Sequence, residues 1–354
     1  MKSIKFSSKK QSQFHIQSSP SILQDLKQSG KERPWCKNKL FSLAISKAYF
    51  LLSELRKYGE IVSLCGNGLK FASCATVEHG KKLIRADFCR ARLCVMCQWR
   101  KSLVIRKQVL ELVHWHREKY KTDIPLLLTL TVVNVRGDEL GRMISLMNDA
   151  WQRLMQRRVV KRAVRSWFRS LEITYNRERQ DFHPHFHALL VVPAHYFSKE
   201  RNFYISQQEW LQLWKASMRD DRITQIDIRT IKARKVGTLE SLAAEVAKYA
   251  TKPSSYVQEN SDGLLEASPS IVEDLHYALK GRRLVGFGGL FRQIREEKKM
   301  VDVEEADLIH IDEDGVVKEC SCKICGSTLL EELYRWEIGL RQYRKVNVSV
   351  KLEK

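Results

Sequence analysis

Residues 183–192 read HPHFHALLVV, and this stretch decides the fold because it is typical of a strand with two chemically different faces. Alternate residues of a β-strand point to the same side. His183, His185 and His187 therefore project together, while Phe186 projects toward the packed side. Imidazoles two residues apart on a rigid strand supply half of a metal site. Three polar residues facing water is the simpler interpretation, but the period-two repeat beside a second strand favours metal.

Glu172 is the candidate third metal ligand. It lies in a predicted strand over 168–175, which the polar loop Asn176–Asp181 joins to the histidine strand. A carboxylate there can face the imidazoles across the strand pair. Two nitrogens and one oxygen, with positions left open, suit a divalent ion such as Mg²⁺ or Mn²⁺ that polarises a phosphate. A surface charge on an edge strand is the alternative for Glu172.

The segments around these strands alternate between strand and helix. Ser206 followed by Glu209 is a capping box that opens a helix, and Pro253 ends the last helix. The order β-α-β-β-α-β-α predicts an α+β fold with a ferredoxin-like, split βαβ antiparallel sheet. The expected elements are strands over 126–134, 168–175, 184–192 and 223–232 and helices over 138–157, 206–218 and 238–252.

Glu245, Tyr249 and Lys252 are spaced i, i+4, i+7, so the expected helix places them on one face. A phenol has an unperturbed pKa of about 10. A neighbouring cation or metal stabilises its anion and makes it a usable nucleophile. Glu245 is a candidate general base, and Lys252 is a candidate partner for a phosphate. Surface helices often show this spacing, so the spacing alone is weak evidence for a catalytic site. It becomes informative because this helix follows the histidine strand within one predicted domain.

Cysteines gather upstream of the predicted sheet. Cys94 and Cys97 form a CxxC, Cys89 precedes this pair, and Cys65 stands beside Gly66. Four thiolates grouped in this way are what a closed tetrahedral zinc site needs. Such a site is structural, because it leaves no open position for a substrate. Buried free thiols are the alternative interpretation.

A second cysteine group lies near the C-terminus and consists of Cys320, Cys322 and Cys325. It is a candidate for a second zinc ion, with His310 as the candidate fourth ligand, and free thiols are equally compatible with it. Because no secretion signal is recognised, the nine cysteines favour metal ligands or free thiols over disulfides.

The chain carries 62 Lys and Arg against 41 Asp and Glu, a net charge of +21. This excess points to a polyanionic partner, and nucleic acid is the usual one. Solubility through charge alone is the plainer explanation. The longest apolar runs have the length of a strand, so no membrane span is predicted. No apolar stretch follows the basic N-terminus, so no signal peptide is expected, and the expected location is the cytoplasm.

Composition and patterning divide the chain into five expected segments. The stretch over 296–319 holds ten Asp and Glu. It is expected to be a linker or a solvated surface. The segments are a flexible basic arm over 1–34, a helical and Cys-rich zinc-binding region over 35–121, a catalytic domain over 122–295, an acidic linker over 296–319 and a small Cys-containing unit over 320–354.

Taken together, these motifs resemble the plasmid replication initiators of the type-1 rolling-circle family, within the HUH endonucleases. The order of the motifs is that of the family, and the combination is far more specific than any single motif. The matching stretches are FCRARLCVMCQWR (88–100), TLTVVN (129–134), LEITYN (171–176), HPHFHALL (183–190), EVAKYATK (245–252) and ALKGRRLVGFGGLF (278–291).

The resemblance implies a role for each matching residue. His185 and His187 would be the metal-binding pair of an HUH nuclease fold. Tyr249 would attack a DNA phosphate and leave a 5′-phosphotyrosyl link and a free 3′-OH. Glu245 would activate the nucleophile that ends the reaction. A second tyrosine serves that purpose in some relatives, but Tyr256 is not favoured here because Pro253 should break the helix between the two tyrosines.

The implied partners are plasmid origin DNA, a host DNA polymerase and a host helicase, since the chain has no GxxxxGK[ST] motif. A homodimer is compatible with the resemblance. Two alternatives stay open. An HUH transposase or relaxase would use the same chemistry on another DNA, although relaxases usually place the tyrosine before the histidines. A zinc-ribbon DNA-binding regulator of an origin would need neither the histidine strand nor Tyr249.

Overall fold

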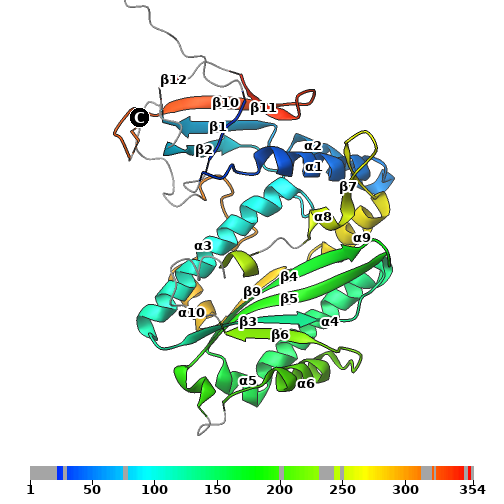
Figure 1. Cartoon of the computed structure of the whole chain (residues 1–354), viewed down its shortest axis with the longest axis vertical. Coiled ribbons are helices and arrows are strands. Elements are labelled where there is room, and N and C mark those ends of the chain that lie inside the picture. Colours follow the sequence, from blue (N-terminus) through cyan, green and yellow to red (C-terminus); the bar gives the residue numbers. More distant parts are fainter. Residues whose placement is uncertain are drawn as a thin grey trace, which may run out of the picture.

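The structure is a computed structural model that describes residues 22–26, 30–74, 79–198, 203–230, 243–247, 251–311, 321–322, 324–346 and 350–351. It contains two five-stranded sheets, and the long helix α3 (Val95–Lys119) runs between them (Figure 1). Within the described residues, no helix is both long and apolar enough to cross a membrane.

The first sheet carries the histidine strand. Its strands lie side by side in the order β6 (Ile226–Thr230), β3 (Ile124–Thr131), β5 (Asp181–Val192), β4 (Ser166–Asn176) and β9 (Val285–Gly289), and every pairing is antiparallel. Helices α4 (Gly137–Gln156) and α5 (Arg158–Ala163) connect β3 to β4, and α6 (Gln207–Met218) precedes β6. This confirms the predicted α+β class and the β-α-β-β-α-β order. β9 was not predicted, because its sequence VGFGG has little strand propensity.

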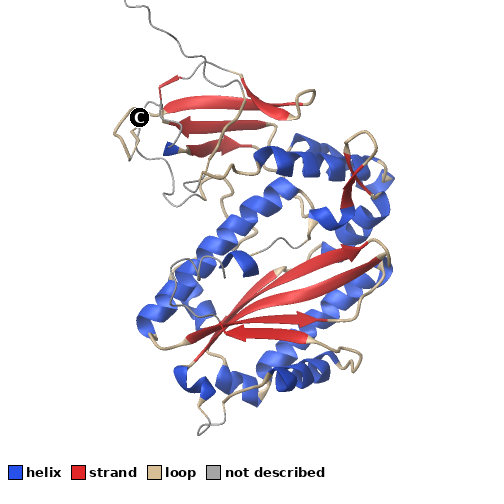
Figure 2. Ribbon diagram, viewed as in Figure 1, coloured by secondary structure: helices blue, strands red, loops and turns tan. Residues whose placement is uncertain are grey.

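Helices cover both faces of this sheet (Figure 2). On one face, Phe186 of β5 packs against Trp151 of α4, with ring centroids 5.9 Å apart. On the other face, Leu189 and Val191 share a buried cluster with Val109 of α3. The alternation of side chains along β5 therefore assigns each of its residues to one helical layer. The predicted capping box of α6 is confirmed.

A tight turn fixes the hairpin between β4 and β5. The ladder runs from Ser166 opposite Val191 to Asn176 opposite Asp181. In the turn, the Asn176 side chain accepts a hydrogen bond from the backbone N–H of Arg179 at 2.9 Å. An Asx turn of this kind stabilises a reversal of the chain. The polar loop seen in the sequence thus sets the pairing of the two strands that carry the candidate ligands.

The second sheet joins the two ends of the chain. Its strands are β11 (Gln342–Lys345), β10 (Leu330–Glu337), β1 (Gly68–Ser73) and β2 (Lys81–Ala86) in that order, and β12 (Val350–Lys351) also pairs with β10. Residues 35–121 and 320–354 are separate units in the prediction, but strands from both lie in this one sheet. Local periodicity carries no information about pairing over such a separation, so the sequence did not reveal it.

Part of the predicted acidic linker is packed structure. After α10 (Leu290–Glu297), residues 301–311 run along α3. Arg100 of α3 is fully buried and donates hydrogen bonds to the carbonyls of Leu308 and Ile309, at 2.7 and 2.8 Å. Glu304 pairs with Lys101 at 2.6 Å, and Leu308 is buried. The prediction of a solvated linker is therefore wrong for 301–311, because basic residues of α3 offset the acidic ones; 312–320 lie outside the described residues.

The remaining elements cover the interface between the two sheets. Helix α1 ends at Phe50, and a short 3₁₀ turn (Ser53–Leu55) separates it from α2. These remaining elements are α1 (Trp35–Phe50), α2 (Arg56–Leu64), α8 (Pro253–Tyr256), α9 (Pro269–Leu279) and a hairpin of β7 (Val257–Glu259) and β8 (Leu265–Ala267).

Gly288 in β9 allows this strand to approach Trp167 of β4. A Cβ atom at position 288 would overlap the indole ring, whereas one at Gly339 would meet nothing within 4 Å. We expect Gly288→Ala to lower the free energy of unfolding by about 2 kcal/mol, because the ring or the strand must move. Urea unfolding of Gly288→Ala and of Gly339→Ala as control measures this. Equal stability of the two variants would contradict the packing of β9 on Trp167.

Candidate metal centre

Three buried side chains of the first sheet bring metal-binding atoms together. Glu172 of β4 lies directly opposite His185 of β5. Its Oε2 is 2.8 Å from Nε2 of His187 and 3.5 Å from Nε2 of His185. One ligand atom from each of the three lies within 4.8 Å of the others. Ligand atoms held 2.0–2.2 Å from one ion lie about 3 Å apart, so this geometry fits a divalent metal.

The second nitrogen of each imidazole is also engaged. Nδ1 of His185 donates to the backbone carbonyl of His183 at 3.2 Å, and Nδ1 of His187 lies 3.3 Å from the hydroxyl of Thr129. These bonds orient the rings and leave both Nε2 atoms directed at Glu172. Hydrogen bonds of this kind orient histidine ligands in metal sites.

Glu172 is negatively charged in this environment. Burial alone would raise the pKa of its carboxyl group, but hydrogen bonds and charge interactions with His185 and His187 outweigh burial and hold that pKa well below its usual range. The site thus offers an anionic oxygen between two nitrogens. This donor set suits a divalent cation and leaves coordination positions open for a substrate.

His183 does not join the other two histidines, although it was predicted as a metal ligand. Its Nδ1 lies 2.8 Å from Oδ1 of Asn134, and the amide of Asn134 donates to Asp181 at 2.8 Å. The group of clustered ligand atoms contains Glu172, His185 and His187 without it. The prediction treated all three histidines alike because strand periodicity gives only the face and not the side-chain partner.

The segment that carries the candidate tyrosine is attached to β4 at two points. The hydroxyl of Ser170 donates to the carbonyl of Val246 at 2.6 Å. Thr251 forms a parallel bridge with Ile173, whose carbonyl accepts a bond from Lys252 at 3.3 Å. Glu172 lies between these two attachment points on β4. Tyr249 itself lies outside the described residues.

Lys252 is not on a helix with Glu245, which corrects the prediction of one helix over 238–252. Residues 243–246 are helical, and the side chain of Glu245 is half-buried. Lys252 is exposed and has extended backbone angles, φ −97° and ψ 95°. A residue before proline is biased away from the helix. Pro253 therefore does not end a helix that reaches Lys252, and instead begins α8.

Four cysteines predicted as zinc ligands come together beside α1. The Sγ of Cys97 is 3.5 Å from that of Cys65 and 3.8 Å from that of Cys89, and Cys94 completes the group. Four sulfurs bound to one zinc ion at 2.3 Å lie about 3.8 Å apart. Burial would raise the pKa of the Cys94 thiol, but hydrogen bonds from the other three cysteines lower it well below its usual value.

Backbone and side-chain donors surround this first cysteine cluster. The backbone N–H groups of Cys89 and Arg90 point to Sγ of Cys65 and Cys97, at 3.4 and 3.2 Å. Lys39 is fully buried, and it donates to the carbonyl of Cys65 at 2.8 Å. Burial lowers the pKa of Lys39 to about 8, while the nearby thiols act in the opposite direction. Such donors stabilise thiolate charge in a buried site.

The C-terminal cysteines have partners that the sequence analysis missed. Cys322 and Cys325 lie with Cys74 and His79, from the region of β1 and β2. His310, the predicted fourth ligand, instead contacts Asp307 at 2.6 Å, and Cys320 lies outside the described residues. A spacing of Cys-x₄-His at 74–79 was the available signal, but nothing in the sequence connected it to Cys322 and Cys325.

The fold and these sites define an α+β protein with a His-His-Glu group that could hold a metal ion and two cysteine clusters. A family model described as "Replication protein" matches residues 80–344. The chain belongs to this family, as the resemblance predicted.

Curated relatives extend over most of the chain. "Protein rep" of Streptococcus pneumoniae is 35% identical over 294 residues, which are 83% of this chain and 88% of the relative. "Protein rep" of Bacillus amyloliquefaciens is 35% identical over 343 residues, 91% of this chain and 97% of the relative. "Protein rep" of Lactiplantibacillus plantarum is 31% identical over 302 residues, 84% and 92% of the two chains. No solved structure matches.

Glu172→Gln tests the metal centre directly. The substitution keeps the shape of the side chain but removes the anionic charge, so we expect affinity for Mn²⁺ to fall by at least about tenfold. Calorimetric titration of the purified chain measures this. Glu178→Gln, in the exposed turn between β4 and β5, is the matched control and should leave affinity unchanged. Equal affinities for the two variants would show that Glu172 is not a ligand.

Proposed function

We propose that this replication protein is a plasmid replication initiator that nicks and rejoins one DNA strand at the origin through Tyr249. The observation that carries the proposal is the convergence of Glu172, His185 and His187, because a replication protein that only bound DNA would need no open metal site. In this proposal the first sheet would be an HUH nuclease fold, and His185 and His187 would be its metal-binding pair. Such an initiator would act in the bacterial cytoplasm.

The attachment of residues 246 and 251 to β4 supports Tyr249 as the nucleophile. The two attachment points, Ser170 and Ile173, flank the ligand Glu172 along the same strand. The cluster of Val246, Ala243 and Val109 also places this segment on the face of the sheet opposite Trp151. His185 and His187 share that face with Leu189 and Val191 because they alternate in step. Residues 243–247, which precede the proposed nucleophile in the chain, thus lie on the same face of the sheet as the proposed metal ligands.

The proposed step exchanges one phosphodiester bond for another. The phenolic oxygen of Tyr249 bonds to phosphorus, and the bond from phosphorus to the 3′ oxygen breaks. The phenol proton passes to a base or water, and the leaving 3′ oxygen takes up a proton. The products are a 5′-phosphotyrosyl link and a free 3′-OH, from which a host polymerase can extend. Attack of that 3′-OH, or of a new one, on the linkage reverses the step and rejoins the strand.

The chain's own residues have separate proposed tasks in this reaction. Glu172, His185 and His187 would hold an Mg²⁺ or Mn²⁺ ion, which when bound supplies a positive charge to polarise the scissile phosphate. Glu245 would accept a proton from the nucleophile that ends the reaction. Lys252, exposed one residue after the Thr251 bridge, would pair with a DNA phosphate. The contacts of His185 and His187 through Nδ1 would keep the ligands oriented between turnovers.

Tyr256 does not fit the role of a second nucleophile. It is buried, and its hydroxyl lies 3.2 Å from that of Thr251. Burial raises its pKa to about 12, away from the range in which a phenolate forms readily. This observation favours a single-tyrosine initiator in which Glu245 activates the terminating nucleophile.

The first cysteine cluster is proposed to hold a structural zinc ion. Cys65, Cys89, Cys94 and Cys97 leave no open position, so the ion would support folding and not catalysis. Its position next to the N-terminus of α3 links the cysteine region to the helix that packs on the first sheet.

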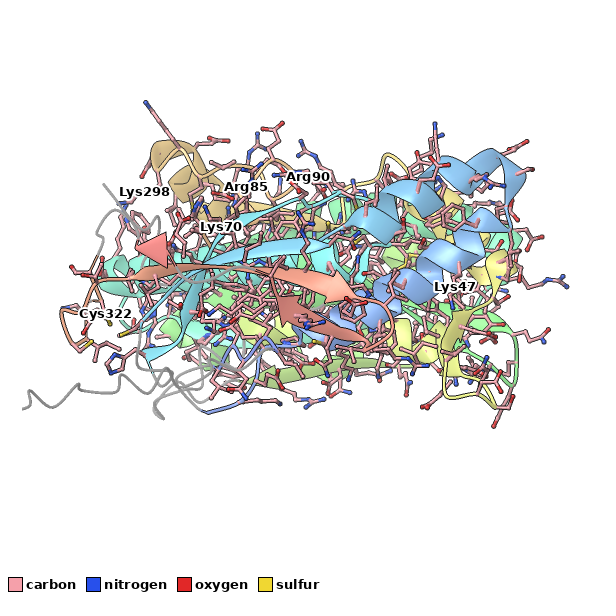
Figure 3. The ribbon with its side chains drawn as sticks, turned by 90° about the horizontal axis from the view of Figure 1, so that it is seen from above. Lys47, Lys70, Arg85, Arg90, Lys298 and Cys322 are labelled. Atoms are coloured by element: carbon pink, nitrogen blue, oxygen red, sulfur yellow. The ribbon has the colours of Figure 1, made fainter. Side chains whose placement is uncertain are left out.

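Origin DNA is the proposed partner, and a groove on the outer face of the second sheet is a proposed contact. The groove is lined by Lys70, Arg85, Arg335 and Trp336 and by the acidic Asp87 and Glu331, of which Glu331 pairs with Lys70. Lys70 and Arg85 lie opposite each other in the β1–β2 ladder and point to the same side in Figure 3. A host helicase would separate the strands, and a second copy of the chain is compatible with this arrangement.

Tyr249→Phe separates the initiator from a regulator that binds without cutting. We expect nicking of supercoiled plasmid carrying the origin to fall at least about 1000-fold, because the covalent step loses its oxygen nucleophile. DNA affinity should be unchanged. Denaturing gels with and without divalent ion measure the nick, and Tyr256→Phe, as control, should retain it. Wild-type protein that binds the correct origin without a nick or adduct would overturn the proposal.

Arg85→Ala tests the groove. Loss of one phosphate contact should weaken binding of all DNA sequences alike and reduce the slope of log K against log salt by about one. Fluorescence anisotropy over a salt series measures the slope. Arg222→Ala is the matched control, because Arg222 is an exposed arginine paired with Asp220 near α6. An unchanged slope for Arg85→Ala would exclude the groove as a phosphate contact.

A further inference from the structure

Four side chains from distant parts of the chain bring ligand atoms together at one end of β1. They are Cys74, His79, Cys322 and Cys325, and one ligand atom of each lies within 4.8 Å of the others. Nδ1 of His79 is 3.4 Å from Sγ of Cys74 and 3.5 Å from Sγ of Cys322. Sγ of Cys325 is 3.5 Å from that of Cys74.

These distances are those of a tetrahedral zinc site with three sulfurs and one nitrogen. Sulfurs at 2.3 Å and a nitrogen at about 2.0 Å from one ion lie about 3.5 Å apart, and two such sulfurs about 3.8 Å apart. The two pairs also have ligand spacings typical of zinc, Cys-x₄-His and Cys-x₂-Cys. A Cys₃His set leaves no open position, so the chemistry is structural.

The turn that carries the Cys-x₂-Cys pair has the shape of a metal-binding knuckle. The backbone N–H of Gly326 donates to the carbonyl of Cys322 at 2.8 Å, and the N–H of Cys322 donates to Ser327 at 2.7 Å. Gly326 has a φ of +71°, which a residue with a side chain rarely adopts. The turn is therefore arranged to present two sulfurs to one point.

We propose that Cys74, His79, Cys322 and Cys325 bind a second structural zinc ion that fastens the C-terminal strands to β1. β10 lies between β1 and β11, so this sheet cannot form without the C-terminal segment. Beside the four ligands, this end of the sheet packs a small buried cluster of Ala72, Leu329, Cys74 and Cys322. An ion there closes a chain loop of about 250 residues, which stabilises the folded state as a long crosslink does. Figure 3 shows Cys322 at the end of the sheet remote from Lys47 of α1.

The C-terminal strands also support the first cysteine cluster. The hydroxyl of Tyr343 in β11 is buried and donates to the carbonyl of Gly66 at 2.7 Å, next to Cys65. The N–H of Trp336 in β10 donates to Asn67 at 2.8 Å. Loss of the second ion should therefore loosen the peptide that holds Cys65 and speed loss of zinc from the first cluster. Both proposed zinc sites would stabilise the second sheet. Neither site contains a residue of the proposed nicking centre.

A disulfide between Cys74 and Cys325 is the competing explanation for their proximity. It would leave Cys322 and His79 without a purpose in the cluster, whereas zinc uses all four. A disulfide also requires two sulfurs at about 2.05 Å and would lower the mass of the chain by two hydrogens. Mass spectrometry of the intact chain therefore distinguishes the two.

The test compares zinc content of the full chain with that of His79→Ala and of His310→Ala, its matched control. His310 is the other histidine near the cysteines in sequence and contacts Asp307 outside the cluster. We expect His79→Ala to lose one zinc per chain by elemental analysis, while His310→Ala loses none. His79→Cys should restore the ion with four sulfurs. The test compares zinc per chain between each variant and the wild type. An ion bound at the His-His-Glu centre contributes equally to both and does not affect the difference.

X-ray absorption of the unmodified chain keeps the test independent of folding of the variants. The two cysteine sites together predict seven sulfur ligands and one nitrogen over two zinc ions. An average of 3.5 sulfur and 0.5 nitrogen ligands per zinc ion, together with the loss of one zinc per chain in His79→Ala, supports the proposal. Unchanged zinc in His79→Ala, a single zinc with four sulfurs in the wild type, or a Cys74–Cys325 disulfide in the intact mass would overturn it. None of these readouts depends on nicking, so failure here leaves the proposed function untouched.

Discussion

The register between β4 and β5 is the constraint on which the site depends. It places Glu172 opposite His185 and, by alternation, puts His185 and His187, the candidate metal ligands, on the face shared with α3 and residues 243–247. A slip of one residue would turn the imidazoles toward Trp151 and the apolar layer beneath it. The Asx turn at Asn176 and the buried residues along β5 hold the register. Packing of the sheet and geometry of the metal centre thus have one cause.

Much of this could be predicted from the sequence because it rests on local patterns. The period of two around His185 gave the strand and its polar face, and the capping box at Ser206 gave a helix start that the structure confirms. The order of elements then gave the antiparallel sheet. The pairing of Glu172 with the histidines followed from a short hairpin, which leaves little freedom in register. The CxxC at Cys94 was equally local, and the structure brings Cys65 and Cys89 to it.

What the sequence did not reveal depends on contacts between distant segments. β10 pairs with β1 across more than 250 residues, and Cys74 and His79 meet Cys322 only through that pairing. Residues 301–311 look like a linker in the sequence because they are rich in acidic residues. In the structure, Lys101 of α3 pairs with Glu304, and Arg100 of α3 donates to the backbone carbonyl of Leu308. His183 shared the periodicity of the two ligands but has Asn134 as its partner. Such choices follow from three-dimensional neighbours and not from spacing.

The central claim is that Tyr249 becomes covalently joined to DNA at a centre held by Glu172, His185 and His187. The most direct measurement is to incubate the chain with a single-stranded origin oligonucleotide and divalent ion, digest the product with trypsin and map the modified peptide by mass spectrometry. The account predicts a 5′-phosphate linked nucleotide on Tyr249, formed only when the ion is present. Cleavage of the oligonucleotide without an attached nucleotide, or attachment to another residue such as Tyr256, would contradict it.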